Sequence, residues 1–340
     1  MIDLKGRLPK YSPKQFSGKR NVRLKRVSNC NFYIKDIVLP GDQPKEYIHV
    51  HFYSKKCSTR KGKPSLWPGY YAKFGYKSYP TESITEFLIN KIGEGIGFNM
   101  NETELALING QVRFLSRDFL NHRNQEKLIH GIEVIAEYLE DRELVDEINA
   151  NRLERRQLLT YELVSTAISE VYHRYSDELL LGFNKMILFD AIVGNNDRHY
   201  ENWGVIGNAQ KANNSVVFSP LYDQARGLLW NLKDSAVKNK FYNISVLKDS
   251  AIEAYCQRPT PRLGIEGIGV DQSYNHFVLI RHLIQNGYLD REMVLSHVND
   301  SALEKAIDIV GSFQNIDYYK SNVIKAILNY RFNKINELLR

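Results

Sequence analysis

Three oxygen-bearing side chains, Asp197, Asn202 and Asp223, have a spacing that suits phosphoryl transfer. Mg²⁺ prefers oxygen ligands, and it usually takes one or two carboxylates and completes its shell with water and substrate phosphates. In phosphoryl-transfer sites, one Asp orients the attacking hydroxyl, an Asn five residues later holds a metal, and a further Asp joins the metal to the phosphates. The sequence therefore predicts a Mg²⁺ site at Asn202 and Asp223, with Asp197 as the base.

The elements around these residues explain how they could meet. An apolar stretch with helical spacing precedes the polar loop 195–202, and Gly194 ends that helix. Two short apolar runs, Trp203–Ile206 and Val216–Phe218, then predict a hairpin that stops before Pro220. Antiparallel pairing of these runs would bring Asn202 close to residues 219–223. The alternative is a surface hairpin in which the Asp and Asn residues only form turns.

A second set of residues favours the phosphoryl-transfer reading. Lys73 is the one charge in the apolar run 70–74, which we expect to be a strand. A strand lysine in kinases reaches the nucleotide phosphates and pairs with a Glu on the next helix. Apolar residues over 84–92 predict that helix, and Glu86 is the candidate partner of Lys73. Glu86 could instead close a capping box with Ser83 at the start of the helix.

A hairpin is predicted by Asn109-Gly110, which lies between two apolar runs, 104–108 and 111–115. In kinase-like folds the segment that leaves this hairpin is the hinge, whose backbone binds the adenine edge. The candidate nucleotide-binding residues there are Arg117, Asp118 and Phe119. Another alternating run, Tyr47–Tyr53, predicts a strand whose His49 and His51 are ordinary strand residues.

The stretch from Gly194 to Gly204, followed by Ser219–Leu228, resembles the catalytic and metal-binding segments of HipA-like serine/threonine kinases. This family comprises toxin kinases of bacterial toxin–antitoxin systems and their stand-alone relatives. The resemblance implies an ATP- and Mg²⁺-dependent kinase with Asp197 as the catalytic Asp, Asn202 and Asp223 as metal ligands, and His199 as a brace of the catalytic loop. It also implies a protein substrate and an antitoxin partner.

The same resemblance implies an α+β, bilobal protein-kinase-like fold. Residues 1–118 would form a β-rich N-lobe that grips the phosphates, and residues 119–340 a mainly helical C-lobe. Family members carry a Ser-containing phosphate loop that is autophosphorylated in some of them. Its candidates here are Ser17–Arg20 and Ser58–Gly62, the second favoured by its position just ahead of a strand.

Two other functions are consistent with these residues. Asp-Arg-His-x-x-Asn also occurs in lipid kinases, so a phosphoinositide or small-molecule kinase is one alternative, and it should bind anionic vesicles. A nucleotide-binding pseudokinase that acts by binding a partner is the other, and it should bind ATP without turnover.

Composition narrows the setting of the protein. At 340 residues and 43% hydrophobic content, the chain can form two substantial cores. It contains no apolar run long enough for a membrane span, and its first residues lack a signal-peptide core. Three widely spaced cysteines, Cys30, Cys57 and Cys256, indicate reduced thiols, and together these features predict a cytoplasmic protein. The net charge of +7 is concentrated in residues 5–26, but we predict no nucleic-acid binding from it.

The rest of the chain gives a coarser outline. Helical spacing is evident near residues 125–149, 151–173 and 176–194, and again over 275–340. Residues 224–270 show few regular signals, so we expect an activation loop and substrate platform there.

Overall fold

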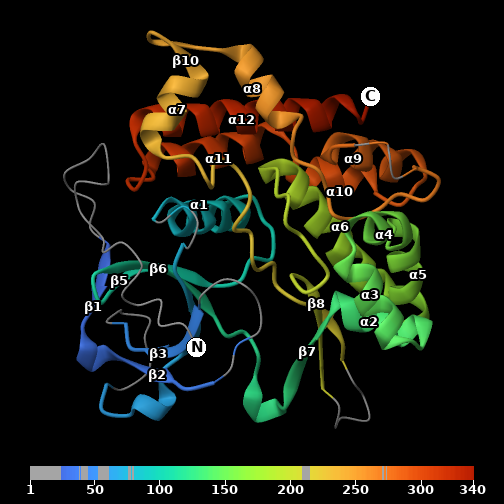
Figure 1. Cartoon of the computed structure of the whole chain (residues 1–340), viewed down its shortest axis with the longest axis horizontal. Helices are drawn as coiled ribbons and strands as arrows, with labels where there is room; N and C mark the ends of the chain where they lie inside the picture. The colour runs from blue at the N-terminus through green and yellow to red at the C-terminus, as the bar shows by residue number, and fades with distance from the viewer. Residues whose placement is uncertain are drawn as a thin grey trace.

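The computed structural model describes residues 24–37, 39, 45–52, 61–75, 78, 80–208, 215–269, 272 and 274–340. The described chain is an α+β structure in which a twisted sheet lies at one end and helices dominate the rest (Figure 1). The predicted α+β class is therefore confirmed. Of the two candidate phosphate loops, Ser17–Arg20 and most of Ser58–Gly62 lie outside the described residues, as does Cys57.

Six strands among the described residues form the first sheet, in the order β1-β5-β6-β4-β3-β2. Only β1 and β5 run parallel, and each of the other neighbouring pairs is antiparallel. The strands are β1 (Lys25–Val27), β2 (Phe32–Lys35), β3 (Lys45–Val50), β4 (Gly69–Lys73), β5 (Thr103–Ile108) and β6 (Gln111–Arg117).

The predicted Asn109-Gly110 hairpin joins β5 and β6. Asn109 and Gly110 have φ of 51° and 75°, which is the left-handed backbone that a two-residue hairpin turn requires. The predicted strand that carries Lys73 is β4, with Lys73 as its last residue. His49 of β3 stacks on Tyr33, and no cluster of three metal-ligating His, Cys, Asp or Glu side chains occurs in the described parts of the chain.

Helix α1 (Thr81–Gly95) covers this sheet and carries Glu86. It begins at Thr81 after Pro80, so Ser83 lies inside the helix and is not its cap; its hydroxyl accepts a hydrogen bond from the amide of Gly75. On its other side, α1 lies beside α11 (Asp300–Ser312), and Phe87 packs against Phe313, with 6.2 Å between ring centroids (Figure 1). One hydrophobic core continues from α1 into the helical part. The division at residue 118 remains a prediction.

The helical part begins with a strand that sequence reasoning missed. Residues 126–130 form β7, which pairs with the predicted hairpin to give the three-stranded sheet β7-β8-β9. The helical spacing predicted near 125–149 is therefore wrong for residues 126–130, whereas most of the remainder is helical. Glu140, with φ of 54°, then ends one helix, and Asp141 caps the next. The elements are β7 (Glu126–His130), α2 (Gly131–Leu139), α3 (Arg142–Ala150), α4 (Arg152–Leu158), α5 (Tyr161–Val171), α6 (Ser176–Val193), β8 (Gly204–Asn208) and β9 (Val217–Phe218).

The segment 224–270 is more regular than we expected. It holds two short helices and a small hairpin that stand at the top of the molecule in Figure 1. Their apolar residues are few and widely spaced, which gives a weak sequence signal, but both helices pack on the last helix of the chain. The elements are α7 (Asp234–Phe241), β10 (Tyr242–Asn243), β11 (Val246–Leu247) and α8 (Asp249–Cys256).

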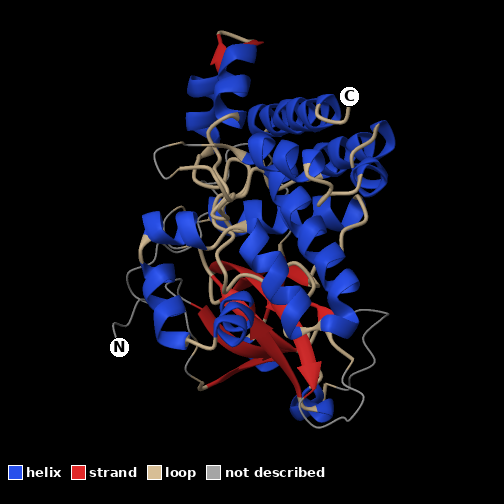
Figure 2. Ribbon diagram, turned by 90° about the vertical axis from the view of Figure 1, so that its right-hand side faces the viewer, coloured by secondary structure: helices blue, strands red, loops and turns tan. Residues whose placement is uncertain are grey.

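The predicted closing helices are present, and Figure 2 shows that helices dominate this end of the molecule. They are α9 (His276–Gln285), α10 (Arg291–His297), α11 and α12 (Tyr318–Glu337). Cys30 is an exposed free thiol and Cys256 a buried one. Across the described residues, we find no helix with the length and apolar character that a membrane crossing requires.

Candidate functional site

The loop that carries Asp197 is anchored by a buried ion pair at the end of α6. Gly194, with φ of 65°, turns the chain out of the helix. Asp190 lies buried in the last turn of α6 and receives two hydrogen bonds from the guanidinium of Arg198, at 2.8 and 2.9 Å. The side-chain amide of Asn195 also donates to Asp190, at 2.9 Å, and its oxygen accepts from the amide of Asp197. The backbone at Asp197 is therefore held in place by the helix before it.

Arg198 also joins the two ends of the β8–β9 hairpin. Its Nη1 donates to the carbonyl of Asn202 at 2.8 Å and to the carbonyl of Tyr222 at 2.6 Å. The residues before the first strand and after the second therefore meet at one guanidinium nitrogen, as the hairpin geometry predicted. Sequence reasoning missed Asp190 and Arg198, although Asp190 is the only charged residue in the apolar end of α6.

The side chain of Asn202 has a fixed orientation. Its Nδ2 donates to the carbonyl of Asp197 at 3.0 Å and lies 3.1 Å from Nε2 of His199. Nδ1 of His199 lies 2.7 Å from Oε2 of Glu201, and the hydrogen bond between these groups holds the pKa of Glu201 at about 2. His199 therefore donates from Nδ1 and accepts at Nε2. This arrangement uses the Asn202 amide hydrogens and leaves its oxygen available to a metal ion.

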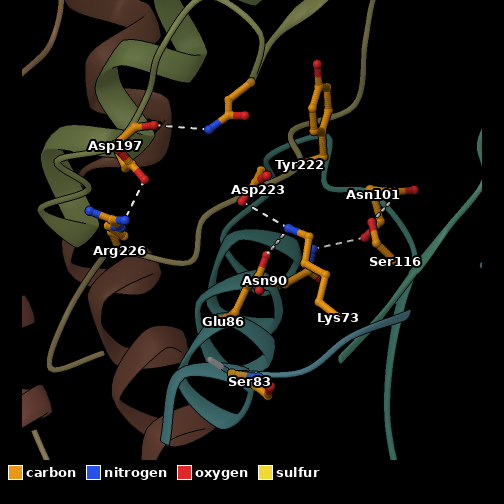
Figure 3. Close-up of polar contacts among 12 residues, drawn as sticks. Lys73, Ser83, Glu86, Asn90, Asn101, Ser116, Asp197, Tyr222, Asp223 and Arg226 are labelled. Carbon is orange, nitrogen blue, oxygen red and sulfur yellow. Dashed lines mark hydrogen bonds and ion pairs between the residues drawn. The ribbon is translucent and has the colours of Figure 1, made fainter. Parts of the chain in front are cut away.

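The carboxylate of Asp197 contacts two arginines. Nε of Arg226 lies 3.0 Å from Oδ2, and a guanidinium nitrogen of Arg262 donates to Oδ1. Figure 3 shows Arg226 directed at Asp197 on the side of Asp223 away from Lys73. The side chain of Asp197 is 19% exposed, so it is accessible to solvent. Neither arginine was expected from the sequence.

Lys73 lies between two carboxylates from different parts of the chain. Its ammonium nitrogen is 3.0 Å from Glu86 of α1 and 2.9 Å from Oδ1 of Asp223 (Figure 3). Burial alone would lower the pKa of Lys73, but Asp223 and Glu86 raise it above its ordinary value. Burial would raise the pKa of Asp223, yet the nearby ammonium keeps it below its usual value. Lys73 is therefore a buried ammonium between Glu86 and Asp223.

Backbone contacts hold Asp223 against the first sheet. The segment between α1 and β5 pairs with the residues before Asp223, through Leu221 N to Asn99 O at 2.7 Å and Asn101 N to Leu221 O at 3.0 Å. Asp223 itself has φ of 59°, a left-handed conformation that Asp tolerates better than most residues. Strained conformations of this kind concentrate at functional sites.

A further cation, Lys45, faces the same place and was missed. Lys45 begins β3 and is the cross-strand partner of Lys73 on β4, so the two side chains share one face of the sheet. Burial and the neighbouring Lys73 lower the pKa of Lys45, while Asp223 and Glu86 raise it. A phosphate group would relieve the repulsion between the two ammonium groups. Lys45 follows a Gly- and Pro-containing stretch, so its strand had no clear beginning in the sequence.

The predicted hinge residues lie at the exit of β6. The backbone amide of Arg117 donates to the carbonyl of Glu102 at 2.9 Å, and that of Asp118 donates to the carbonyl of Gly69 at 3.0 Å. Both amides are therefore used in backbone hydrogen bonds within the protein. The carboxylate of Asp118 accepts from Tyr47 at 2.7 Å. Phe119 packs its ring against Tyr222, with 5.8 Å between centroids, which places it beside the residue before Asp223. The role of the three residues in nucleotide binding remains a prediction.

The described donors fit a Mg²⁺ ion. Lys73 occupies Oδ1 of Asp223 and leaves Oδ2 for a ligand, and the oxygen of Asn202 is free of the hydrogen bonds that orient its amide. One carboxylate and one amide oxygen suit Mg²⁺, which keeps several waters and binds substrate phosphates. We therefore retain Asn202 and Asp223 as candidate metal ligands.

A buried histidine supports the catalytic loop from behind and should make stability depend on pH. Nε2 of His276 donates to the carbonyl of Asn195 at 2.7 Å, and burial, with Arg331 nearby, lowers the pKa of His276 to about 3. The unfolded chain takes up this proton near pH 6.5 and the folded chain does not. Stability is therefore complete well above pH 6.5 and falls as the pH decreases towards 3, by about 2 kcal/mol between pH 7 and 5.

Urea unfolding at pH 7 and pH 5 would measure this dependence. The wild type should lose about 2 kcal/mol on acidification, and His276→Gln should be less stable at pH 7 but lose much less. His173→Gln, which changes an exposed histidine, is the matched control and should behave as the wild type. Equal losses in the wild type and His276→Gln would show that His276 does not cause the effect.

Comparisons with known proteins show the family and the fold of this chain. The model of the family described as HipA-like C-terminal domain matches residues 37–261. The solved structure of the Helicobacter pylori proinflammatory kinase CtkA is similar over 93% of this chain and 96% of that one, with a TM-score of 0.68 and 16% identity. This similarity confirms the kinase-like fold. HipA from Shewanella oneidensis MR-1, solved with HipB and operator DNA, has a TM-score of 0.48 and 11% identity over 79% of this chain and 58% of that one. No curated protein sequence matches the chain.

Proposed function

We propose that this chain, which belongs to the family of HipA-like C-terminal domains, is a protein serine/threonine kinase that uses ATP and Mg²⁺. The observation that carries the proposal is the position of Lys73 between Glu86 and Asp223, beside the loop of Asp197 and Asn202. A lysine–glutamate pair, a catalytic Asp and two metal ligands are the parts that phosphoryl transfer requires.

Each residue has a role in this proposal. Lys73, oriented by Glu86, contacts the nucleotide phosphates, and Lys45 adds a second positive charge there. Mg²⁺ held by Asn202 and Asp223 would neutralise charge on the phosphates. The acceptor hydroxyl oxygen attacks the γ-phosphorus, the bond between that phosphorus and the ADP oxygen breaks, and the hydroxyl proton passes to Asp197. His199 and Glu201 act on Asn202 by fixing its amide.

Transfer of label from γ-labelled ATP tests the proposal. The protein would be incubated with Mg²⁺ and, in separate reactions, with no acceptor, a bacterial lysate or phosphoinositide vesicles. Label on protein supports the proposal, and mass spectrometry then locates the modified residue. Label on lipid alone would assign a phosphoinositide kinase, and ATP binding without any transfer would assign a binding module.

From family membership we further propose that the protein is a toxin and that it has an antitoxin partner. Expression in a bacterial host should then arrest growth, and Asp197→Asn should remove the arrest at equal protein level. Undiminished growth with an active, well-expressed kinase would contradict the toxin role while leaving the kinase intact.

Glu86→Gln should weaken the use of ATP without abolishing it. The substitution removes the negative charge of Glu86 but leaves an amide oxygen that can still accept from Lys73, and Lys73 keeps Asp223 as a charged partner. A hydrogen bond to a charged group contributes about 1.5–3 kcal/mol, and the variant loses a large part of it. We expect kcat/KM for ATP to fall about tenfold or more. Glu94→Gln, on the exposed side of α1, is the matched control and should change little. Equal effects of the two substitutions would argue against a role of Glu86 in orienting Lys73.

A further inference from the structure

Arg226 and Arg262, which contact Asp197, differ from Arg198, which lies in the same loop as Asp197. Arg198 is buried, and its charge is matched by a two-point contact with Asp190. Arg226 and Arg262 are 32% and 30% exposed, and they share the single carboxylate of Asp197. Arg198 therefore has a structural role, whereas Arg226 and Arg262 are accessible from the site.

One carboxylate does not neutralise two guanidinium groups. Within the described residues, Asp197 is the only carboxylate that pairs with either arginine. Their other contacts are uncharged: Arg226 lies over the ring of Trp230, 5.2 Å from its centroid, and Nε of Arg262 is 3.4 Å from the carbonyl of Asn196. Each guanidinium has five N–H donors, so most remain available to another acceptor. The site therefore carries surplus positive charge beside the proposed base.

The location of this charge favours the acceptor over the nucleotide. The cations expected to meet the nucleotide phosphates, Lys45 and Lys73, lie on the first sheet. In Figure 3, Arg226 and Asp197 lie on the opposite side of Asp223 from Lys73. Arg262 reaches Asp197 from the segment between α8 and α9. The pair therefore lies where the acceptor hydroxyl must approach Asp197.

We propose that Arg226 and Arg262 together bind an acidic side chain of the protein acceptor, close to the hydroxyl that receives the phosphoryl group. This inference rests on the proposed kinase function and specifies its substrate class. The acidic group takes over N–H donors that now contact Asp197, and it leaves a carboxylate oxygen of Asp197 free to accept the hydroxyl proton. The preferred acceptors are serine or threonine residues flanked by aspartate or glutamate.

A set of peptides with one serine, flanked by glutamate, glutamine or lysine, tests this preference. We expect the wild type to use the glutamate peptides with at least tenfold higher kcat/KM than the glutamine peptides, since a hydrogen bond to a charged group contributes about 1.5–3 kcal/mol. Arg226→Gln and Arg262→Gln should reduce this ratio to about 3 or less, mainly through KM. Arg262→Lys keeps the charge and should retain part of the preference. Arg258→Gln changes an exposed arginine of the same segment and should keep the wild-type ratio.

Three outcomes would overturn the inference. If the wild type labels all peptides without a preference for acidic ones, Arg226 and Arg262 do not bind an acidic group of the acceptor, and the proposed kinase function is unaffected. An equal fall in kcat for every peptide in the Arg→Gln variants, with the preference unchanged, would assign the arginines to the γ-phosphoryl group. A wild type that labels no peptide and no protein in a lysate contradicts the proposed function itself, and the inference with it.

Discussion

Asp223→Asn should raise the dissociation constant for Mg-ATP by about 100-fold or more, because it removes the one negatively charged metal ligand in the candidate site. Loss of a group that only supports a metal ligand already costs 10–100-fold in metal affinity, so loss of the carboxylate should cost at least as much. The same carboxylate pairs with Lys73, whose ammonium would then keep only Glu86 as a charged partner. Both effects act on the binding of nucleotide and metal together.

Titration of ATP with and without Mg²⁺ separates these effects. In wild type, Mg²⁺ should strengthen ATP binding strongly, and in Asp223→Asn it should have little influence. Asp308→Asn, which changes an exposed carboxylate of α11, is the matched control and should retain the wild-type dependence on Mg²⁺. If Asp223→Asn bound Mg-ATP as tightly as the wild type, Asp223 would have no place in the metal site.

The sequence predicted best those residues whose neighbours are set by local structure. Asp197 and Asn202 share one loop, and the hairpin that follows brings Asn202 back towards Asp223, so secondary structure alone was sufficient to group them. The strand and helix of Lys73 and Glu86 are also adjacent in the chain. Their assigned roles remain predictions, and their positions are now observed.

The residues that were missed are brought to the site by tertiary packing. Arg262 lies 65 residues after Asp197, in a segment without an apolar period, and nothing in the local sequence indicates which carboxylate it contacts. The ion pair of Asp190 and Arg198 was missed because a charged residue within an apolar helix reads as a surface position unless its partner is known. Strand β7 was read as helix because its alternation is short and the amphipathic helix α2 follows it directly.

Asp197→Asn should slow phosphoryl transfer by about 10²–10⁴-fold, the usual contribution of a positioned acid–base group. The amide cannot take the acceptor proton, but it has nearly the shape of the carboxylate and leaves the loop anchored through Arg198 and Asp190. Asp197 is not a ligand in the proposed metal site, so the affinity for Mg-ATP should stay within a few-fold of the wild-type value. The loss should therefore appear in kcat, in contrast to Asp223→Asn, which acts on binding.

Single-turnover transfer from saturating Mg-ATP measures this step directly, and nucleotide affinity measured on the same preparations identifies any general damage to the fold.

A second effect is expected in this variant, because Arg226 and Arg262 lose the negative charge that they share. Acidic peptides should then bind at least as tightly to Asp197→Asn as to the wild type, although they are phosphorylated far more slowly. Transfer at the wild-type rate would show that the acceptor proton leaves by another route. Weaker binding of acidic peptides would show that Arg226 and Arg262 do not recognise the acceptor. Tight binding of both Mg-ATP and acidic peptide with slow transfer is the combination that distinguishes a missing base from a missing substrate site.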